Sequence, residues 1–188
     1  LVPKLEKDAT TTTPTKTTTP TKTTTPTKLV STPKTFVTEG DTWIYQDNGK
    51  APENGWNNLN FDDGSWLSGL AQLGFGDGDE ATQIAPRGVT HYFRQAFTVD
   101  DPTAIAGITG KLLRDDGAVV YLNGTEVWRS NMPEGQITFE TEAASSISST
   151  AENTFESKAL SPSLLVTGRN VIAVEIHDRL NSSDISFD

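Results

Sequence analysis

Two adjacent aspartates, Asp115 and Asp116, lie in the most patterned stretch of the chain, LLRDDGAVVYLNGTEVWRSNMPEG. Two carboxylates can hydrolyse a glycoside when they lie about 5–9.5 Å apart across the bound sugar. Neighbouring residues of a strand point to opposite faces, so from a strand this pair cannot face one sugar. We therefore favour a turn in which one carboxylate accepts backbone N–H groups. A ligand or metal contact ranks second, and a catalytic role ranks third.

A second group of carboxylates lies in the segment GDGDE and consists of Asp77, Asp79 and Glu80. Alternating carboxylates, with glycines for tight turns, suit the oxygen-rich coordination of calcium. The ligand spacing of an EF-hand loop is absent. We expect a structural Ca²⁺ ion at this segment, with solvated turn residues as the simpler alternative.

Further polar residues are expected to meet at one edge of the fold, provided that the strands ending there run in the same direction. Planar polar groups beside an aromatic ring suit the hydroxyls of a sugar. The alternative is a hydrogen-bond network that fastens loops to one another. The candidate set is Arg114, Asp115, Asp116, Asn131, His177 and Asp184.

Four tryptophans supply flat surfaces on which the CH face of a sugar can pack. Trp56 lies in the polar loop ENGWNNLN, and Trp128 lies near the end of an expected strand with its outer face free. These two are the candidate sugar contacts. Trp66, within FDDGSW, and Trp43, within an early strand, are expected in the core instead.

Nucleophilic catalysis has no recognisable motif in this chain. His91 and His177 are its two histidines, and neither has a serine or cysteine partner in a known nucleophile pattern. The chain has no cysteine, which excludes disulfides, zinc–thiolate sites and thiol nucleophiles. We expect no catalytic residues and no enzymatic activity.

The charge distribution narrows the choice of partners. Residues 1–34 hold six lysines against Glu6 and Asp8, yet the chain has a net charge of −10, so the remainder is strongly acidic. Such a domain would be repelled by the nucleic-acid backbone. No apolar run approaches the roughly 20 residues that span a bilayer. We expect a monomer that binds neither nucleic acid nor membrane.

Residues 11–28 are three copies of the repeat TTTPTK. Such a repeat has nothing to bury, and its prolines and β-branched threonines favour an extended backbone. We therefore expect residues 1–34 to be a flexible, disordered linker within a longer protein. Tracts of this kind resemble the linkers of secreted multimodular polysaccharide-degrading enzymes and of cellulosome components, which implies an extracellular location and covalently linked neighbouring modules.

Residues 35–188 have the pattern of an all-β domain. In HYFRQAFTV (91–99), Phe93 lies on the same face of the expected strand as the other apolar residues, and Arg94 lies on the opposite face. In RNVIAVEIH (169–177), Glu175 also lies on the face opposite the apolar residues. If these strands are neighbours, Arg94 and Glu175 should pair across them.

Many short strands separated by turn residues are typical of an antiparallel β-sandwich. Asn123-Gly124 predicts a type I′ hairpin turn, because both residues tolerate positive φ. Ser161 followed by Pro162 predicts a short helical turn at 161–166. The other expected strands are 42–46, 108–114, 118–123, 125–130, 136–142 and 154–160.

Several segments, in this order, also resemble a jelly-roll module of the galactose-binding-like type that is attached to many secreted bacterial proteins. The chain is similar as well to the non-catalytic sugar-binding domain of family-2 glycoside hydrolases. The family usually continues a few strand residues beyond SSDISFD, so we expect the last strand to be truncated. The segments are GW (55–56), FDDGSW (61–66), LGFGDGDE (73–80), HYFRQAF (91–97), LLRDDGAVVYLNGTEVWRSNMPEG (112–135), RNVIAVEIH (169–177) and SSDISFD (182–188).

The resemblance implies a non-catalytic carbohydrate-binding module that keeps a secreted enzyme or cellulosomal protein near plant or cell-wall polysaccharide. The alternative is a structural spacer or protein-interaction domain that packs against a neighbouring catalytic domain. An exposed platform of tryptophan or tyrosine would favour the first function, and a flat surface without aromatic residues would favour the second.

Overall fold

The structure is a computed structural model that describes residues 33–147, 150–180 and 182–188. The chain divides into two units, Leu1–Lys34 and Thr35–Asp188. The linker expected at 1–34 lies almost entirely outside the described residues. Within the part that the structure describes, no helix is long and apolar enough to cross a membrane.

The second unit is an all-β domain of short strands with two single-turn 3-10 helices. The elements are β1 (Thr42–Gln46), β2 (Leu67–Leu70), β3 (Leu73–Phe75), β4 (Thr82–Gln83), β5 (Thr90–Val99), η1 (Pro102–Ala104), β6 (Ile108–Leu112), β7 (Arg114–Asp115), β8 (Gly117–Leu122), β9 (Thr125–Ser130), β10 (Glu156–Leu160), η2 (Pro162–Leu164), β11 (Gly168–His177) and β12 (Ile185–Phe187).

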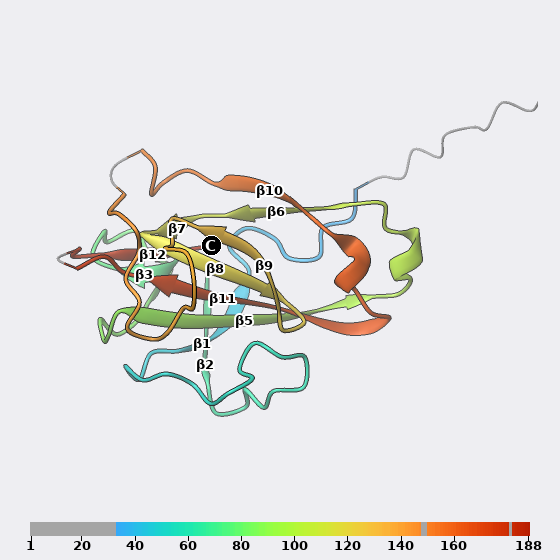
Figure 1. Ribbon diagram of the computed structural model, residues 1–188, viewed down its shortest axis with the longest axis horizontal. Coiled ribbons are helices and arrows are strands. Elements are labelled where there is room, and N and C mark those ends of the chain that lie inside the picture. The colour runs from blue at the N-terminus through green and yellow to red at the C-terminus, as the bar shows by residue number, and fades with distance from the viewer. Residues whose placement is uncertain (1–32, 148–149, 181) are drawn as a thin grey trace, which may run out of the picture. The chain divides into compact units, whose positions relative to one another are not determined.

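The strands form two layers, as expected for a sandwich (Figure 1). One layer is a six-stranded antiparallel sheet in the order β2-β1-β5-β11-β8-β9. The other contains the sheet β4-β3-β12-β7 and the pair β10-β6, with β3 and β4 as its parallel pair. Reciprocal backbone hydrogen bonds between Leu113 and Asp188 link the end of β12 to the chain between β6 and β7.

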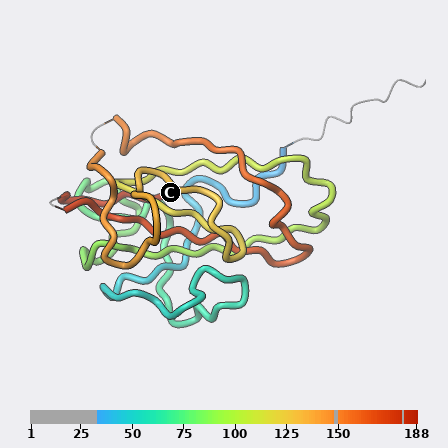
Figure 2. The backbone as a smooth tube through the Cα atoms, viewed as in Figure 1, coloured from blue at the N-terminus to red at the C-terminus, as the bar shows by residue number. Residues whose placement is uncertain are grey.

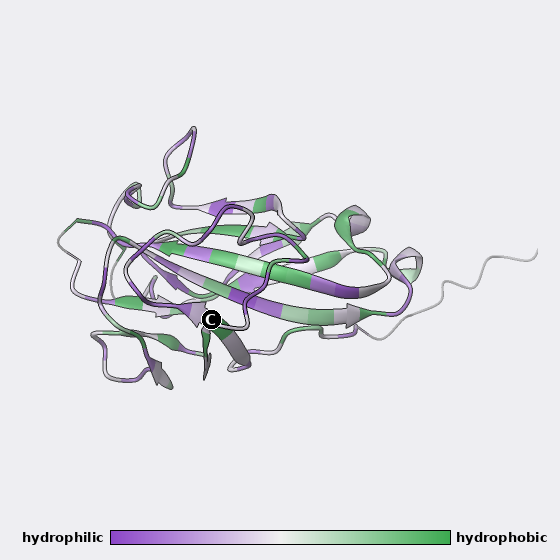
Figure 3. Ribbon diagram, turned by 90° about the horizontal axis from the view of Figure 1, so that it is seen from below, coloured by the Kyte–Doolittle hydropathy of each residue, from purple (hydrophilic) through white to green (hydrophobic). Residues whose placement is uncertain are grey.

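The core lies between the layers and is centred on Phe187 of β12. Its ring stacks on Phe93 of β5 at 4.3 Å and meets Trp43 of β1 edge-on at 4.7 Å. Such aromatic pairs contribute about 0.5–1.5 kcal/mol beyond their area burial. A β-carbon at Gly74 would lie 1.9 Å from the carbonyl oxygen of Ile185, so a glycine is required where β3 packs on β12. Figure 3 shows the alternation of hydrophobic and hydrophilic residues along the long strands that face this core.

The hairpin turn at Asn123-Gly124 is confirmed. Asn123 has φ 51° and Gly124 has φ 89°, which is the backbone of a type I′ turn. The pairing of β8 with β9 shifts register between Val120 and Tyr121. The expected helical turn is also confirmed as η2, where the Ser161 hydroxyl accepts the backbone N–H of Ser163.

The strand predicted at 136–142 is wrong, because this segment is a loop. A turn closes between Thr138 and Thr141, whose N–H donates to the Thr138 carbonyl at 2.9 Å. The hydroxyl of Thr90 then binds the carbonyl of Phe139, so a side chain satisfies the backbone here instead of a neighbouring strand. The prediction also missed β2, β3 and β4, which are too short to show a clear alternation. The last strand expected at SSDISFD is present as β12.

His91 of β5 is 1 % exposed and lies 5.8 Å from the ring of Phe75. Burial lowers the pKa of His91 to about 4. The charge of Asp47 opposes this shift, and His177 adds to it. Neither ring nitrogen has a hydrogen-bond partner among the described residues. His91 is therefore neutral in the folded domain at ordinary pH.

Acidification should destabilise the domain through His91. The unfolded side chain takes a proton near pH 6.5 and the folded one only near pH 4, so this stability is present above 6.5 and is lost as the pH falls toward 4. The shift corresponds to roughly 3 kcal/mol. Urea unfolding near pH 7 and pH 4.5 should show a smaller loss of stability for His91→Leu than for the wild type. Equal losses in the two proteins would contradict this assignment.

Candidate functional site

The outward face of the six-stranded sheet is covered by two loops. Residues 90–94 of β5 and 173–177 of β11 are buried on both faces, which an open sheet surface would not allow. The first covering loop, residues 47–66, joins β1 to β2 and is drawn in cyan to teal in Figure 2. The second, residues 131–147, follows β9. The space between these loops is the candidate site.

Arg94 fastens the first loop to the sheet. Its side chain is fully buried, and Nε donates to Oδ2 of Asp63 at 2.8 Å. Nη1 donates to the backbone carbonyls of Trp56 and Asn58, and the guanidinium lies 5.2 Å from the centre of the Phe61 ring. A buried charge with these partners holds the loop in one position, because leaving the charge unpaired would be costly.

The expected pairing of Arg94 with Glu175 is wrong, although β5 and β11 are neighbours. The register places Ala173 opposite Arg94 and Tyr92 opposite Glu175. The loop over the sheet offers Arg94 a carboxylate and two carbonyls, which engage its guanidinium in place of Glu175. Glu175 instead accepts a hydrogen bond from the Tyr121 hydroxyl at 2.7 Å.

His177 and Thr90 fasten the second loop. The Thr90 hydroxyl donates to the carbonyl of Phe139 at 2.6 Å, and Nδ1 of His177 lies 2.6 Å from the carbonyl of Thr141. Because a carbonyl only accepts, Nδ1 carries the hydrogen of this contact. Nε2 lies 3.6 Å from Oε2 of Glu175, so a protonated ring would form an ion pair with that carboxylate.

A cleft of about 320 Å³ opens between the two loops. Tyr92, Tyr121 and Glu175 lie on its sheet side. Trp56 meets the ring of Tyr92 edge-on at 4.8 Å and that of Tyr121 at 5.7 Å. Phe139, from the second loop, stacks on Tyr92 at 6.5 Å. The cleft thus combines aromatic rings, phenolic hydroxyls and a carboxylate.

The size and chemistry of the cleft suit a small polar ligand with apolar faces. Its volume lies within the roughly 300–1,000 Å³ that is common for small-molecule sites. Burial, followed by the charge of Glu175, raises the pKa of Tyr92 and of Tyr121. Both phenols therefore remain neutral, and the Tyr121 hydroxyl orients the carboxylate of Glu175.

The candidate tryptophans lie in different places. Trp56 is half-buried and lines the cleft, as expected for a loop residue available to a ligand. Trp128 is 7 % exposed and belongs to the core, so the expectation of a free outer face is wrong. The shifted register pairs Trp128 with Val120, a core residue, and this sets the face on which its ring lies.

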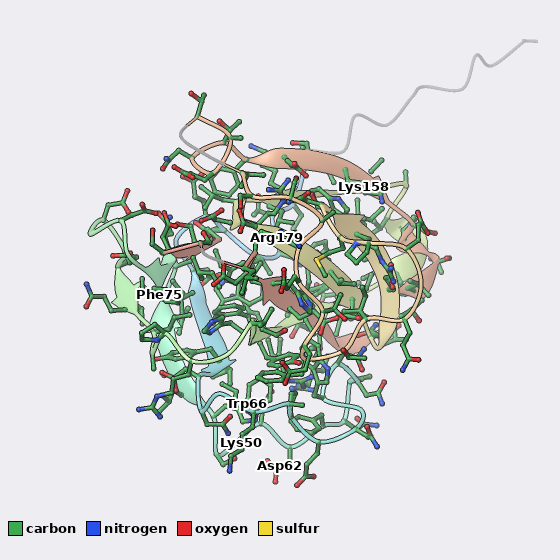
Figure 4. The ribbon with its side chains drawn as sticks, turned by 60° about the vertical axis from the view of Figure 1, so that its left-hand side comes forward. Lys50, Asp62, Trp66, Phe75, Lys158 and Arg179 are labelled. Atoms are coloured by element: carbon green, nitrogen blue, oxygen red, sulfur yellow. The ribbon has the colours of Figure 1, made fainter. Side chains whose placement is uncertain are left out.

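Trp66 and Trp43 were both expected in the core, and only Trp43 lies there. Trp66 is half-buried in the first loop, where its ring stacks on Trp56 at 6.5 Å and meets Phe61 edge-on. In Figure 4, the labelled Trp66 lies with Asp62 at one end of the molecule. Trp66 therefore packs against Trp56 within the first loop.

Asp116 is the expected backbone cap. Its carboxylate accepts the backbone N–H of Ile147 at 2.6 Å and that of Arg179 at 2.9 Å. Its carbonyl accepts from Nδ2 of Asn131 at 3.1 Å, and Asn131 also binds the backbone and hydroxyl of Ser145. These contacts fasten loops to one another, which was the alternative to a sugar site.

The other polar residues that were expected to meet at one edge of the fold lie in different places. Arg114 donates to the Ser130 hydroxyl at 2.9 Å and to Glu156 at 2.6 Å. His177 contacts the carbonyl of Thr141 in the second loop. Asp115 and Asp184 lie together on the second layer. Burial, then the hydrogen bond and charge of Asp116, raises the pKa of Asp115 to about 9.

The expected calcium ligands Asp77, Asp79 and Glu80 each bring a carboxylate oxygen within 4.8 Å of the other two. Glu80 already accepts the backbone N–H of Asp77 at 2.9 Å and of Gly78 at 3.0 Å, which closes the turn. Asp77 also accepts from the Ser186 hydroxyl at 3.1 Å. Calcium at this turn stays a prediction.

Three residues on the sheet side of the cleft were not predicted from the sequence as ligand contacts. Tyr92, Tyr121 and Glu175 lie on adjacent strands, out of phase with the core residues. That phase was visible in the sequence for Tyr92 and Glu175. The sequence did not show which strands are neighbours. It also did not show that loops enclose these side chains.

No protein-family model and no curated protein matches the chain. Solved structures similar to it include three bacterial β-glucuronidases. That of Bifidobacterium dentium with coumarin-3-O-glucuronide is 15 % identical over 73 % of this chain, with a TM-score of 0.43. That of Ruminococcus gnavus with D-glucaro 1,5-lactone is 16 % identical over 76 % of this chain, with a TM-score of 0.45. That of Bacteroides uniformis, covalently bound to cyclophellitol-6-carboxylate aziridine, is 14 % identical over 81 %, with a TM-score of 0.46. The match covers 17–22 % of the length of these enzymes.

Removing the carboxylate of Asp63 should destabilise the domain by about 2–3 kcal/mol, because it leaves the buried guanidinium of Arg94 without its charged partner. The expected loss is below that of a fully buried pair, since the Asp63 side chain is 26 % exposed. The matched control is Asp62→Ala, which removes an exposed neighbouring carboxylate. Urea unfolding of Asp63→Ala and Asp62→Ala measures both effects. Similar losses in the two variants would contradict the role given to Arg94.

Proposed function

We propose that this chain is a non-catalytic carbohydrate-binding module and that sugar binds in the cleft between the two loops. The observation that carries the proposal is the convergence of Trp56, Tyr92, Tyr121 and Glu175 on one cleft of about 320 Å³. A sugar has CH faces that pack on aromatic rings and hydroxyls that bind carboxylates and phenols. This cleft supplies both kinds of partner.

Glu175 is the polar centre of the proposed site. Tyr121 donates to its Oε1, and His177 lies beside its Oε2. A carboxylate oriented by the Tyr121 hydroxyl retains lone pairs that can accept sugar hydroxyls without a large loss of side-chain entropy. Trp56 then provides the partly exposed ring against which a sugar face packs.

The repeated TTTPTK segment and the resemblance to modules of secreted bacterial proteins support the wider context. In this proposal the module belongs to a secreted multimodular polysaccharide-degrading enzyme or cellulosomal protein. It acts outside the cell as a monomer and keeps the attached modules near plant or cell-wall polysaccharide.

A non-catalytic role is part of the proposal. Glu53 also lines the cleft, but it is exposed to solvent. Glycosidases need one carboxyl in an apolar setting that keeps it protonated as the acid. Glu175 is engaged by Tyr121, and Glu53 has no such setting. Turnover of aryl glycosides by the purified chain would contradict this part of the proposal.

Affinity electrophoresis of the full chain against a panel of soluble polysaccharides tests binding directly. At least one polysaccharide should retard the wild type. Tyr121→Phe should weaken its affinity about fivefold, because it removes the hydrogen bond that orients Glu175. Tyr45→Phe, at a buried tyrosine of the core, is the matched control and should bind like the wild type. The proposal fails if no glycan binds or if Tyr45→Phe weakens binding as much as Tyr121→Phe.

The role of spacer or protein-interaction domain has one structural feature in its favour. Leu67 and Leu70 are 51 % and 54 % exposed on β2, which is an edge strand of the large sheet. Exposed apolar residues on a sheet edge are suited to contact with another protein. A polysaccharide panel without any binder would favour this second role.

A further inference from the structure

Three carboxylates from separate parts of the chain converge on the second layer, away from the residues that line the cleft. Asp115 lies in β7, Glu152 lies in the loop before β10, and Asp184 directly precedes β12. One carboxylate oxygen of each lies within 4.8 Å of the other two. Three like charges at these distances repel one another unless a proton or a cation neutralises them.

Asp115 distinguishes this group from an ordinary acidic patch on the surface. Its side chain is 1 % exposed, and its Oδ1 has no hydrogen-bond partner among the described residues. A buried carboxylate oxygen without a partner loses the hydration that it has in the unfolded chain. The buried oxygen therefore points to a ligand that the protein atoms do not provide.

The strand register explains why these side chains meet. Asp115 lies opposite Ser186 in the pairing of β7 with β12. Asp184 precedes Ser186 by two residues and shares its face, because side chains alternate along an extended chain. The Ser186 hydroxyl donates to Asp77, which brings a fourth carboxylate toward the same face.

The neighbouring arginines are engaged elsewhere. Arg114 forms an ion pair with Glu156 at 2.6 Å, and Arg179 forms one with Glu142 at 2.8 Å. These contacts commit both guanidinium groups to carboxylates outside the converging set.

We propose that Asp115, Glu152 and Asp184 bind a calcium ion. Carboxylate oxygens are hard ligands, which favour Ca²⁺ or Mg²⁺ over the metals that prefer imidazole or thiolate. Ca²⁺ holds oxygens at about 2.3–2.6 Å, so two of its ligands can lie up to about 5 Å apart, whereas Mg²⁺ limits this separation to about 4.2 Å. Ligands that reach the ion from three chain segments also suit the flexible coordination of Ca²⁺.

The ion would join three segments that are otherwise held by few backbone bonds. β7 has two residues and β12 has three, and the two strands pair through only two residues each. A cation shared by Asp115 and Asp184 ties these strands together and fixes the loop that carries Glu152. Calcium is therefore expected to stabilise the sandwich and not to contact the sugar in the cleft.

Calorimetric titration of the EDTA-treated full chain with CaCl₂, together with thermal melts, tests the proposal without any glycan. The wild type should bind Ca²⁺ and melt at a higher temperature in its presence, and Mg²⁺ should have a weaker effect. Glu152→Gln and Asp184→Asn should each weaken Ca²⁺ binding about tenfold or more, because each removes a charged ligand. The matched control is Asp62→Asn, an exposed carboxylate outside both acidic groups, which should retain wild-type affinity. Asp79→Asn removes a carboxylate of the other acidic group and reports whether the ion lies there instead.

Two results would overturn the proposal. One is a wild type that neither binds Ca²⁺ nor gains melting temperature. The other is loss of binding in Asp79→Asn with retention in Asp184→Asn, which would place the ion at the Asp77–Glu80 turn. Glu152 and Asp184 are only partly buried, so their variants should fold even if Asp115→Asn does not. Polysaccharide binding is measured separately, so failure of the calcium site leaves the proposed function standing.

Discussion

The buried guanidinium of Arg94 is the interaction on which the outer face of the large sheet depends. Its position on β5 faces away from the sandwich core, where a charged residue would normally meet water. The first loop instead supplies Asp63 and two backbone carbonyls, one of which belongs to Trp56. The charge on the sheet thus determines where the ring of Trp56 lies, and a loop rich in asparagine and glycine becomes one wall of a cleft.

The same sheet is consequently buried on both sides where β5 and β11 cross the molecule. One side is the core around Phe187, and the other holds Tyr92, Glu175 and His177 beneath the two loops. Polar side chains in such a layer must find partners, and the contacts of Glu175 with Tyr121 and of His177 with Thr141 provide them. These contacts fix the polar groups of the cleft before any ligand arrives, which lowers the entropic cost of binding.

Local signals in the sequence predicted the fold well, and contacts between distant segments escaped prediction. Asn123-Gly124 specifies its turn through its own backbone preferences. The carboxylate of Asp116 accepts backbone N–H groups as expected, but these belong to Ile147 and Arg179, which lie far along the chain. Arg94 could not be assigned to Asp63 from the alternation of β5, because the partner comes from a loop whose path the alternation does not determine. Trp128 shows a second limit, since a register shift of the hairpin decides which face its ring occupies.

The indole N–H resonances of the tryptophans provide the most direct test that sugar binds between the two loops. The chain has four tryptophans, so a two-dimensional NMR titration of the labelled protein with a retained oligosaccharide follows four separate reporters. The account predicts that Trp56 shifts most, that Trp66 follows through its stacked ring, and that the core residue Trp43 stays in place. Shifts confined to Trp128 and Trp43, with Trp56 unmoved, would contradict a binding site in this cleft.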